Sequence, residues 1–228
     1  MPEPTIGAQS PEPTPLLETV SGEVRERLLA LGSRRTYESN AVLFLQDAPC
    51  AGLFVVQRGL VKISKFSPEG REQVLRFVSP GGSFNEVAVL DGGPNPATAT
   101  AVEHSELLLV PRDAMLGLIA DTPGLAETMI QSLAGRLRHL VELVEDLSFR
   151  HVSERVARIL LQSVAPHSGV GAGVDMTRRV TQREMAEMAG TSREVVARAL
   201  KAIEAAGAIS IDRGEITLIA PGKLSNLV

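Results

Sequence analysis

The sequence predicts an α+β protein with an N-terminal antiparallel β-roll, one long helix and a C-terminal winged helix-turn-helix. Three patterns support this prediction. Short apolar runs separated by turn residues fill positions 34–111, apolar residues recur at heptad spacing through 122–147, and two short helical patterns adjoin each other at 181–200. These patterns are typical of a β-roll, of a helix with one apolar seam and of a helix-turn-helix, respectively.

Length and composition limit the class of protein. The chain has 228 residues, of which 44% are hydrophobic and 22% charged, the proportions of a globular protein long enough for two domains. The single cysteine, Cys50, excludes an internal disulfide and a cysteine-ligated iron–sulfur or zinc centre, so we expect no metal and a reducing, cytoplasmic setting. Neither a membrane-spanning run nor a secretion signal is present in the sequence, so no membrane association is expected.

Charge is distributed unevenly along the chain. The formal net charge is −4, but residues 151–228 carry 10 Lys and Arg against 8 Asp and Glu, whereas residues 1–150 carry 13 against 19. The weakly basic C-terminal part is therefore where we expect a polyanionic partner.

Four segments follow from these patterns. Residues 1–20 are rich in proline and are expected to form a disordered arm, with a short docking segment as the alternative. Residues 21–120 are expected to form the β-roll that senses an effector, after a helix at 22–31. Residues 121–150 form the long helix, and 151–228 the winged helix-turn-helix, with a Gly-rich loop at 169–173.

The predicted β-roll contains five apolar runs that read as strands. Ser67–Gly70 joins two of them, because Pro68 favours a turn and Gly70 tolerates a positive φ angle. The candidate strands are Leu43–Leu45, Leu53–Val56, Leu60–Phe66, Val74–Val78 and Leu107–Val110.

The long helix is predicted to begin at Thr122 and Pro123, a pair typical of a helix start. Apolar residues then follow at alternating intervals of three and four, a mean period of 3.5 that keeps one seam facing a partner helix. We therefore predict a homodimer, and packing of this helix on its own domain is the alternative. The seam consists of Ile130, Leu133, Leu137, Leu140, Val144 and Leu147.

The C-terminal motif reads TQREMAEMAGTSREVVARAL from Thr181 to Leu200. Thr181 with Glu184, and Thr191 with Glu194, both match the S/T-x-x-E capping box that opens a helix. Gly190 suits the tight turn between the two helices. Two short strands, Ile209–Ile211 and Glu215–Ile219, then predict a wing around the turn at residues 212–214.

The second helix of this motif predicts a surface that binds double-stranded DNA. Arg193, Glu194 and Arg198 lie near its start on the polar side, where Arg can bind guanine and Glu can bind cytosine in the major groove. An ordinary solvated face with a Glu194–Arg198 pair is the alternative. The predicted contacts to the DNA backbone are Arg178, Arg179, Arg183, Thr181, Ser192 and Lys201.

The order of the parts, together with S-R-E-x-V-x-R at Ser192–Arg198, resembles the CRP/FNR family of bacterial transcription regulators over residues 20–228. By this resemblance the β-roll is similar to a cyclic-nucleotide-binding domain. The resemblance also implies that Arg193, Glu194 and Arg198 read an inverted repeat with half-sites similar to TGTGA. A homodimer, with RNA polymerase as a further partner, is implied in the same way.

The residues that match the family's effector pocket depart from its pattern. Cyclic-AMP-binding members have a G-E pair and an R-S pair where this sequence has Asn85–Glu86 and Pro96–Ala97, and Leu140 and Val141 stand where the family has an adenine-contacting Thr-Ser. A cyclic phosphate without the guanidinium would pay an uncompensated desolvation cost. Cyclic AMP is therefore not expected as a ligand, and both an unidentified effector and constitutive DNA binding remain open.

Three other hypotheses remain. Residues 67–75 and 84–97 look like the nitric-oxide-responsive branch of the family, some of whose members carry haem, although no two of His104, His139, His151 and His167 stand at ligand spacing. A dimeric scaffold that does not read DNA is another. A cupin-like enzyme on the roll would use Glu86 and His104, but H-x-H, P-loop and HExxH motifs are all missing, so no catalytic residue is assigned.

Overall fold

The computed structural model describes residues 19–164, 180–212 and 215–225. The predicted arm before Thr19, the loop at 169–173, Arg178, Arg179 and the tip of the wing at 213–214 lie outside the described residues. Within the described ranges, no helix is both long and apolar enough to cross a membrane.

The N-terminal half contains eight strands and three helices among the described residues. The helix α2 (Gly22–Leu31) begins at Ser21, whose hydroxyl accepts a hydrogen bond from the Val24 amide. It is followed by β1 (Ser33–Tyr37), β2 (Val42–Phe44), β3 (Gly52–Arg58), β4 (Val61–Phe66), β5 (Glu72–Val78), β6 (Ser83–Phe84), α3 (Glu86–Asp91), β7 (Thr98–Ala101), β8 (Ser105–Pro111) and α4 (Arg112–Asp121).

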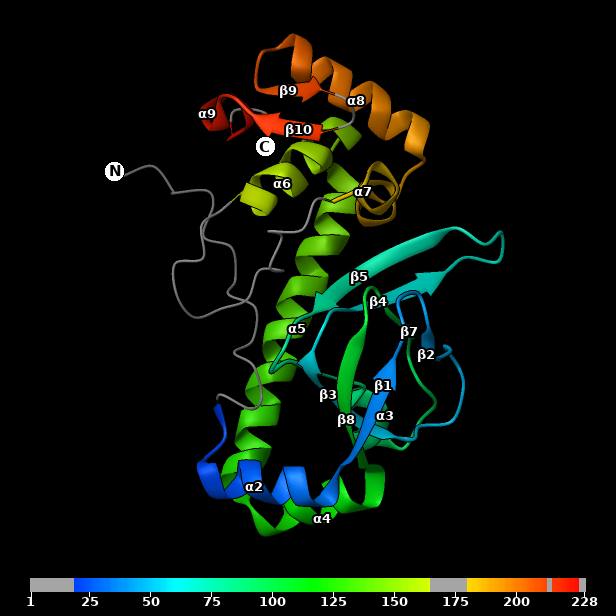
Figure 1. Ribbon diagram of the computed structural model, residues 1–228, viewed down its shortest axis with the longest axis vertical. Helices are drawn as coiled ribbons and strands as arrows, with labels where there is room; N and C mark the ends of the chain where they lie inside the picture. Colours follow the sequence, from blue (N-terminus) through cyan, green and yellow to red (C-terminus); the bar gives the residue numbers. More distant parts are fainter. Residues whose placement is uncertain (1–18, 165–179, 213–214, 226–228) are drawn as a thin grey trace.

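The C-terminal half consists mainly of helices. It contains α5 (Pro123–Phe149), α6 (Val152–Val164), α7 (Gln182–Ala189), α8 (Arg193–Ala205), β9 (Ile209–Asp212), β10 (Glu215–Leu218) and α9 (Pro221–Ser225). In Figure 1, α5 runs along the length of the molecule and joins the strands at one end to the small helical domain at the other. The predicted α+β fold class is confirmed.

Two antiparallel four-stranded sheets form the β-roll, with strand orders β1-β8-β3-β6 and β2-β7-β4-β5. Side chains from both sheets pack between them, because alternate residues of each strand point inward. Phe54 and Phe84 stack with ring centroids 5.1 Å apart, and Phe44 lies 5.4 Å from Phe54. This aromatic group is the centre of the roll's core.

The β4–β5 hairpin has the predicted turn. Gly70 adopts a φ angle of 78°, and its amide donates to the Ser67 carbonyl at 2.9 Å. All five predicted strands are present, and their ends differ from the predicted ones by at most two residues. The strands β1, β6 and β7 and the helices α3 and α4 were not predicted. β1 is an edge strand with the polar sequence SRRTY, so it lacks the apolar alternation that indicates a strand.

The helix α5 has two differently packed parts. Near its start, Leu125 and Met129 are buried against α2 and α4, so this end belongs to the core of the roll. From Ile130 onward, the apolar seam is largely exposed: Ile130, Leu137 and Val144 retain 66%, 63% and 62% of their accessible surface. The start of α5 therefore packs on the core of its own chain, which is the alternative named above. The seam residues from Ile130 onward stay exposed in the described structure.

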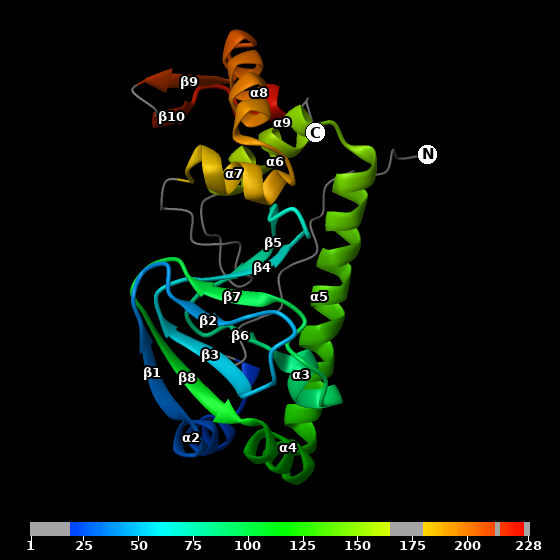
Figure 2. The same cartoon turned by 90° about the vertical axis from the view of Figure 1, so that its right-hand side faces the viewer.

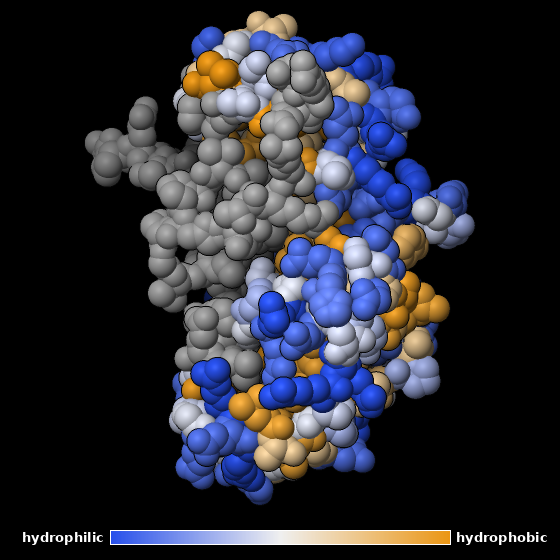
Figure 3. All heavy atoms as spheres, viewed as in Figure 1, coloured by the Kyte–Doolittle hydropathy of each residue, from blue (hydrophilic) through white to orange (hydrophobic). Residues whose placement is uncertain are grey.

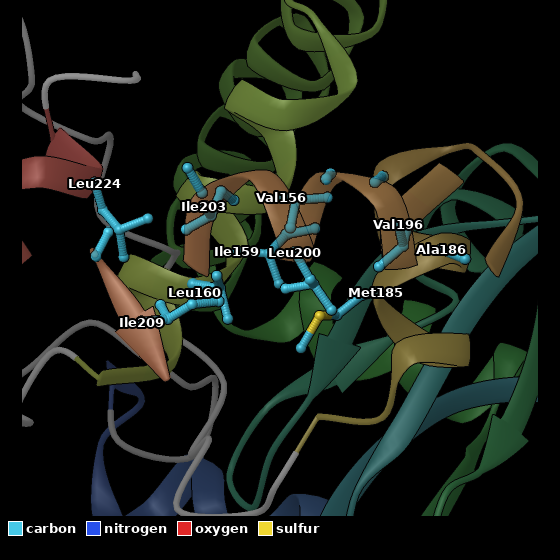
Figure 4. Packing of buried hydrophobic residues seen from close by; sticks show 14 residues of the cluster. Val156, Ile159, Leu160, Met185, Ala186, Val196, Leu200, Ile203, Ile209 and Leu224 are labelled. Carbon is cyan, nitrogen blue, oxygen red and sulfur yellow. The ribbon is translucent and has the colours of Figure 1, made fainter. Parts of the chain in front are cut away.

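The small C-terminal domain has a core of its own. Figure 4 shows side chains from α6, α7, α8, β9 and α9 that meet between these elements. Leu200 of α8 lies at the centre and is fully buried, as is Val156 of α6. This packing leaves the opposite side of α8 at the surface.

Candidate nucleic-acid interface

The helix α7 begins and ends as predicted. The Thr181 hydroxyl accepts from the Glu184 amide at 3.2 Å, and the Glu184 carboxylate accepts from the Thr181 amide at 2.8 Å, which completes the capping box. At the other end, Gly190 adopts a left-handed conformation with a φ angle of 60°. Both signals were readable in the sequence because they depend only on local residues.

The predicted capping box at the start of α8 is wrong by one residue. Ser192 is the N-cap, and its hydroxyl accepts from the Val195 amide at 3.4 Å. Thr191 instead closes α7, because its amide donates to the Ala186 carbonyl at 2.9 Å. Glu194 therefore lies within the first turn of α8, where bonding to Ser192 lowers the pKa of its carboxyl.

The predicted base-reading residues lie together on the exposed side of α8. Val196 and Leu200 face the core, whereas Arg193, Glu194 and Arg198 are exposed. The hydrogen bond to Ser192 lowers the pKa of the Glu194 carboxyl most, and the charges of Arg193 and Arg198 lower it further. In Figure 3 the surface over α8 is mostly hydrophilic. The donors of α8 are thus available to an external partner.

The predicted backbone contacts have different local roles. The hydroxyl of Thr181 donates to Glu184 at 2.8 Å, and Ser192 caps α8. Lys201 is exposed on the same side of α8 as Arg198. Arg183 on α7 is 73% exposed, and its Nε donates to Glu187 at 2.8 Å. Arg178 and Arg179 lie outside the described residues.

The wing is present as a two-stranded antiparallel sheet. Ile209 pairs with Leu218, and Ile211 pairs with Ile216. The Glu204 carboxylate at the end of α8 accepts from the Ile211 amide at 2.7 Å. This bond fixes the first strand of the wing to the helix that would enter the groove.

Two arginines of α6, for which the sequence predicted no role, stabilise the junction between α5 and α6. Arg155 of α6 donates to the Ala189 carbonyl of α7 and to the Arg150 carbonyl, both at 2.9 Å. Arg158 binds both carboxylate oxygens of Asp146 on α5, at 2.8 and 3.0 Å. These contacts fix the helix-turn-helix to the end of α5. Their only sequence signal is charge within the amphipathic pattern of α6, which does not identify a partner.

The Asn85–Glu86 pair lies in the roll and is bound by the protein itself. Asn85 has a φ angle of 75°, and its Nδ2 donates to the Gly52 carbonyl at 3.1 Å and to Asn95 Oδ1 at 3.0 Å. Glu86 is buried and accepts from Arg136 of α5 at 2.7 Å. Burial would raise the pKa of Glu86, but the charges of Arg136 and Arg76 outweigh it and hold the pKa below its usual value.

The other predicted pocket residues differ in exposure. Ala97 is buried at the start of β7, whereas Pro96 beside it is exposed. Leu140 and Val141 are 41% and 60% exposed on α5 and so lie at the surface with the seam. All four side chains lack a charge or a hydrogen-bond donor that could bind a phosphate.

The histidines of the described part do not form a shared site. His104 lies 3.4 Å from Glu38, and His139 lies 3.2 Å from the Leu75 carbonyl oxygen. No group of three potential metal ligands occurs among the residues that were described. Since Glu86 pairs with Arg136 and His104 with Glu38, the cupin-like alternative gains no support.

This arrangement defines a class of protein in which a β-roll is linked by a long helix to a winged helix-turn-helix domain. Residues 34–122 match the cyclic nucleotide-binding domain and residues 154–227 match the Crp-like helix-turn-helix domain. The chain is 35% identical over 180 residues to the CRP-like cAMP-activated global transcriptional regulator of Mycobacterium tuberculosis, across 78% of this chain and 80% of that protein.

Two further relatives extend the similarity to nearly the full chain. The cyclic AMP receptor protein of Thermus thermophilus is 32% identical over 203 residues, which cover 89% of this chain and 91% of that protein. The structure of CLP, the c-di-GMP responsive global regulator of Xanthomonas campestris, matches 87% of this chain and 99% of that chain, with a TM-score of 0.75 and 25% identity. The chain therefore belongs to the CRP/FNR family of DNA-binding transcription regulators. The relatives named above are regulators and not enzymes.

Proposed function

We propose that the protein is a homodimeric bacterial transcription regulator that reads an inverted repeat with half-sites similar to TGTGA. The exposed face of α8 is the observation that supports this function, because it presents the guanidinium groups of Arg193 and Arg198 to solvent. Each guanidinium can donate two hydrogen bonds to a guanine, and Glu194 can accept from a cytosine. Phosphate contacts by Arg183, Lys201 and the two helix N-termini would set the register without reading the sequence.

The exposed seam of α5 supports the dimer. Ile130, Leu137 and Val144 are seven residues apart and more than three-fifths exposed, a spacing that fits a parallel pair of helices. A two-fold axis along α5 would place two α8 helices on successive major grooves, about 34–36 Å apart. Leu137→Asp should convert the dimer to a monomer in sedimentation experiments, whereas Phe66→Asp, an equally apolar-to-acidic change on the exposed hairpin, should not.

Cyclic AMP is not proposed as the effector. The carboxylate of Glu86 is already bound by Arg136, and Pro96 and Ala97 supply no cation for a cyclic phosphate. Calorimetry of the full chain with cyclic AMP should therefore give no stoichiometric heat of binding. Tight binding would overturn this proposal, and regulation would then resemble that of the cAMP-activated relatives.

A haem-based sensor remains the second candidate within the same family. To bind haem, His104 would have to leave Glu38 and His139 would have to leave the Leu75 carbonyl, whereas His151 is already exposed. A Soret band after reconstitution with haem would favour this candidate over an unidentified effector or constitutive binding. In either case we propose that the regulator acts on DNA in the cytoplasm and that RNA polymerase is its partner at promoters.

Selection of duplexes from a random pool tests the proposed function. The purified full chain should enrich an inverted repeat that contains TGTGA-like half-sites, and cell extract should alter the enrichment if a small effector is required. The absence of an enriched repeat under both conditions would contradict the proposal. Enrichment of a single, unrepeated half-site would contradict the dimer.

A further inference from the structure

The β4–β5 hairpin of the roll packs directly against the first helix of the helix-turn-helix. Leu60, Val74 and Phe77 form a small buried cluster, and Met188 of α7 packs against it. Gln73 donates to the Met188 carbonyl at 3.3 Å. Figure 2 shows β5 beneath α7 in the view from the side. The two domains therefore meet at a second place besides the α5–α6 junction.

Four charged residues line this contact and alternate in sign. Lys62 of β4 lies 2.8 Å from Glu72 and 3.0 Å from Glu187 of α7, and all three side chains are at least 85% shielded from solvent. The other oxygen of Glu187 accepts from Arg183 at 2.8 Å, and Arg183 is 73% exposed. One carboxylate thus binds a lysine of the roll on one side and a solvent-facing arginine of α7 on the other.

We propose that Glu187 couples the DNA-phosphate contact of Arg183 to the docking of the β4–β5 hairpin. The inference rests on the proposed function, because Arg183 is taken as a phosphate ligand. In the DNA-free protein, Arg183 is bound to Glu187. In the complex, Arg183 turns to a phosphate and Glu187 is left with Lys62 alone.

The direction of this coupling follows from charge balance. Lys62 and Arg183 together neutralise Glu72 and Glu187, so the departure of Arg183 leaves two shielded carboxylates around one ammonium group. Burial would raise the pKa of Glu187, but bonds from Arg183 and Lys62 outweigh it and lower the pKa. Lys62 and Arg183 repel each other and bind the same carboxylate, so each weakens the hold of Glu187 on the other. DNA should therefore tighten hairpin docking, and loss of Lys62 should strengthen the hold of Glu187 on Arg183.

A double-mutant cycle on the full-length dimer tests the coupling. Lys62→Met should weaken binding to the selected duplex about threefold to tenfold, because Arg183 becomes harder to withdraw from Glu187. The same substitution should have no effect on affinity in an Arg183→Gln background or in a Glu187→Gln background. Lys65→Met is the matched control, since Lys65 lies exposed on the same strand, and it should leave affinity within about twofold of the wild type.

A merely structural role for Lys62 would give a different result. In that case Lys62→Met would weaken binding in the Arg183→Gln background as well, and this outcome would overturn the coupling. Hydrogen exchange supplies the reciprocal readout: amides of β5 should gain protection on DNA binding in the wild type and not in Glu187→Gln. If the wild type selects no duplex, the proposed function fails; if it selects one and the cycle is additive, only the coupling fails.

Discussion

The two domains use their arginines in opposite ways. On α8, the side chains of Arg193 and Arg198 are exposed to solvent. Where α5 packs on the roll, the Arg136 side chain of α5 is 14% exposed and binds Glu86 and the Ser83 carbonyl. The comparison indicates that the winged domain presents its arginine donors to an external anion. At the roll, the donors of Arg136 are instead occupied by the carboxylate of Glu86.

The largest expected effect is on the exposed arginines. Arg193→Ala combined with Arg198→Ala removes four base-reading groups from the dimer, each worth about 1–3 kcal/mol, so specific affinity should fall by more than about a thousandfold. Gel-shift titration against the selected duplex measures this loss, and circular dichroism should show unchanged folding. Retention of specific binding would contradict the assignment of α8 as the reading helix.

A smaller effect, on stability rather than binding, is expected in the roll. Arg136→Met leaves the buried Glu86 carboxylate without its closest cation and should lower the free energy of unfolding by about 3–5 kcal/mol in urea denaturation. Arg58→Met, which breaks an exposed pair with Glu106, should cost about 0–1 kcal/mol. Equal losses in the two variants would show that Arg136 is not held internally as described.

The smallest expected effect is a fall in the free energy of unfolding at acidic pH. The pKa of Glu86 is lowered in the folded state, so the unfolded state binds its proton more readily. The contribution of Glu86 is therefore present above the unfolded pKa and is lost as pH falls through the folded pKa. Urea denaturation of the wild type from about pH 6 to about pH 3 should show this loss.

Glu86→Gln serves as the control for that acid dependence. This variant should be less stable than the wild type at neutral pH, and the difference should shrink as the pH falls. A difference between the two proteins that is constant across the whole range would contradict a lowered pKa for Glu86.

Local signals made most of the fold predictable. Turn residues at Ser67–Gly70, the Thr181 capping box and the glycine at position 190 each act over a few residues, and each was confirmed. Thr191 misled the prediction because its hydroxyl matches a capping pattern, while its amide is required to close the preceding helix. A capping motif directly after a left-handed glycine has two possible roles, and only the geometry of the turn decides between them.

The contacts between the domains could not be predicted in the same way. Lys62 and Glu187 are 125 positions apart in the sequence, and each has charged neighbours that would serve equally well as partners. Glu86 resembled a ligand-binding residue, and its pairing with Arg136 depends on how α5 crosses the roll. Such pairs are set by tertiary packing, which periodicity and motif spacing do not report.

Arg155 connects the end of α5 mechanically to the helix-turn-helix. One guanidinium ties the carbonyls at the close of α5 to the carbonyl at the close of α7, so these helices turn together. α8 has 13 residues and, at about 1.5 Å per residue, forms a lever arm of about 20 Å. A rotation of about 10° at its base would displace its far tip by about 3 Å, close to the 3.4 Å or so that B-form DNA advances along its axis for each phosphate of one strand.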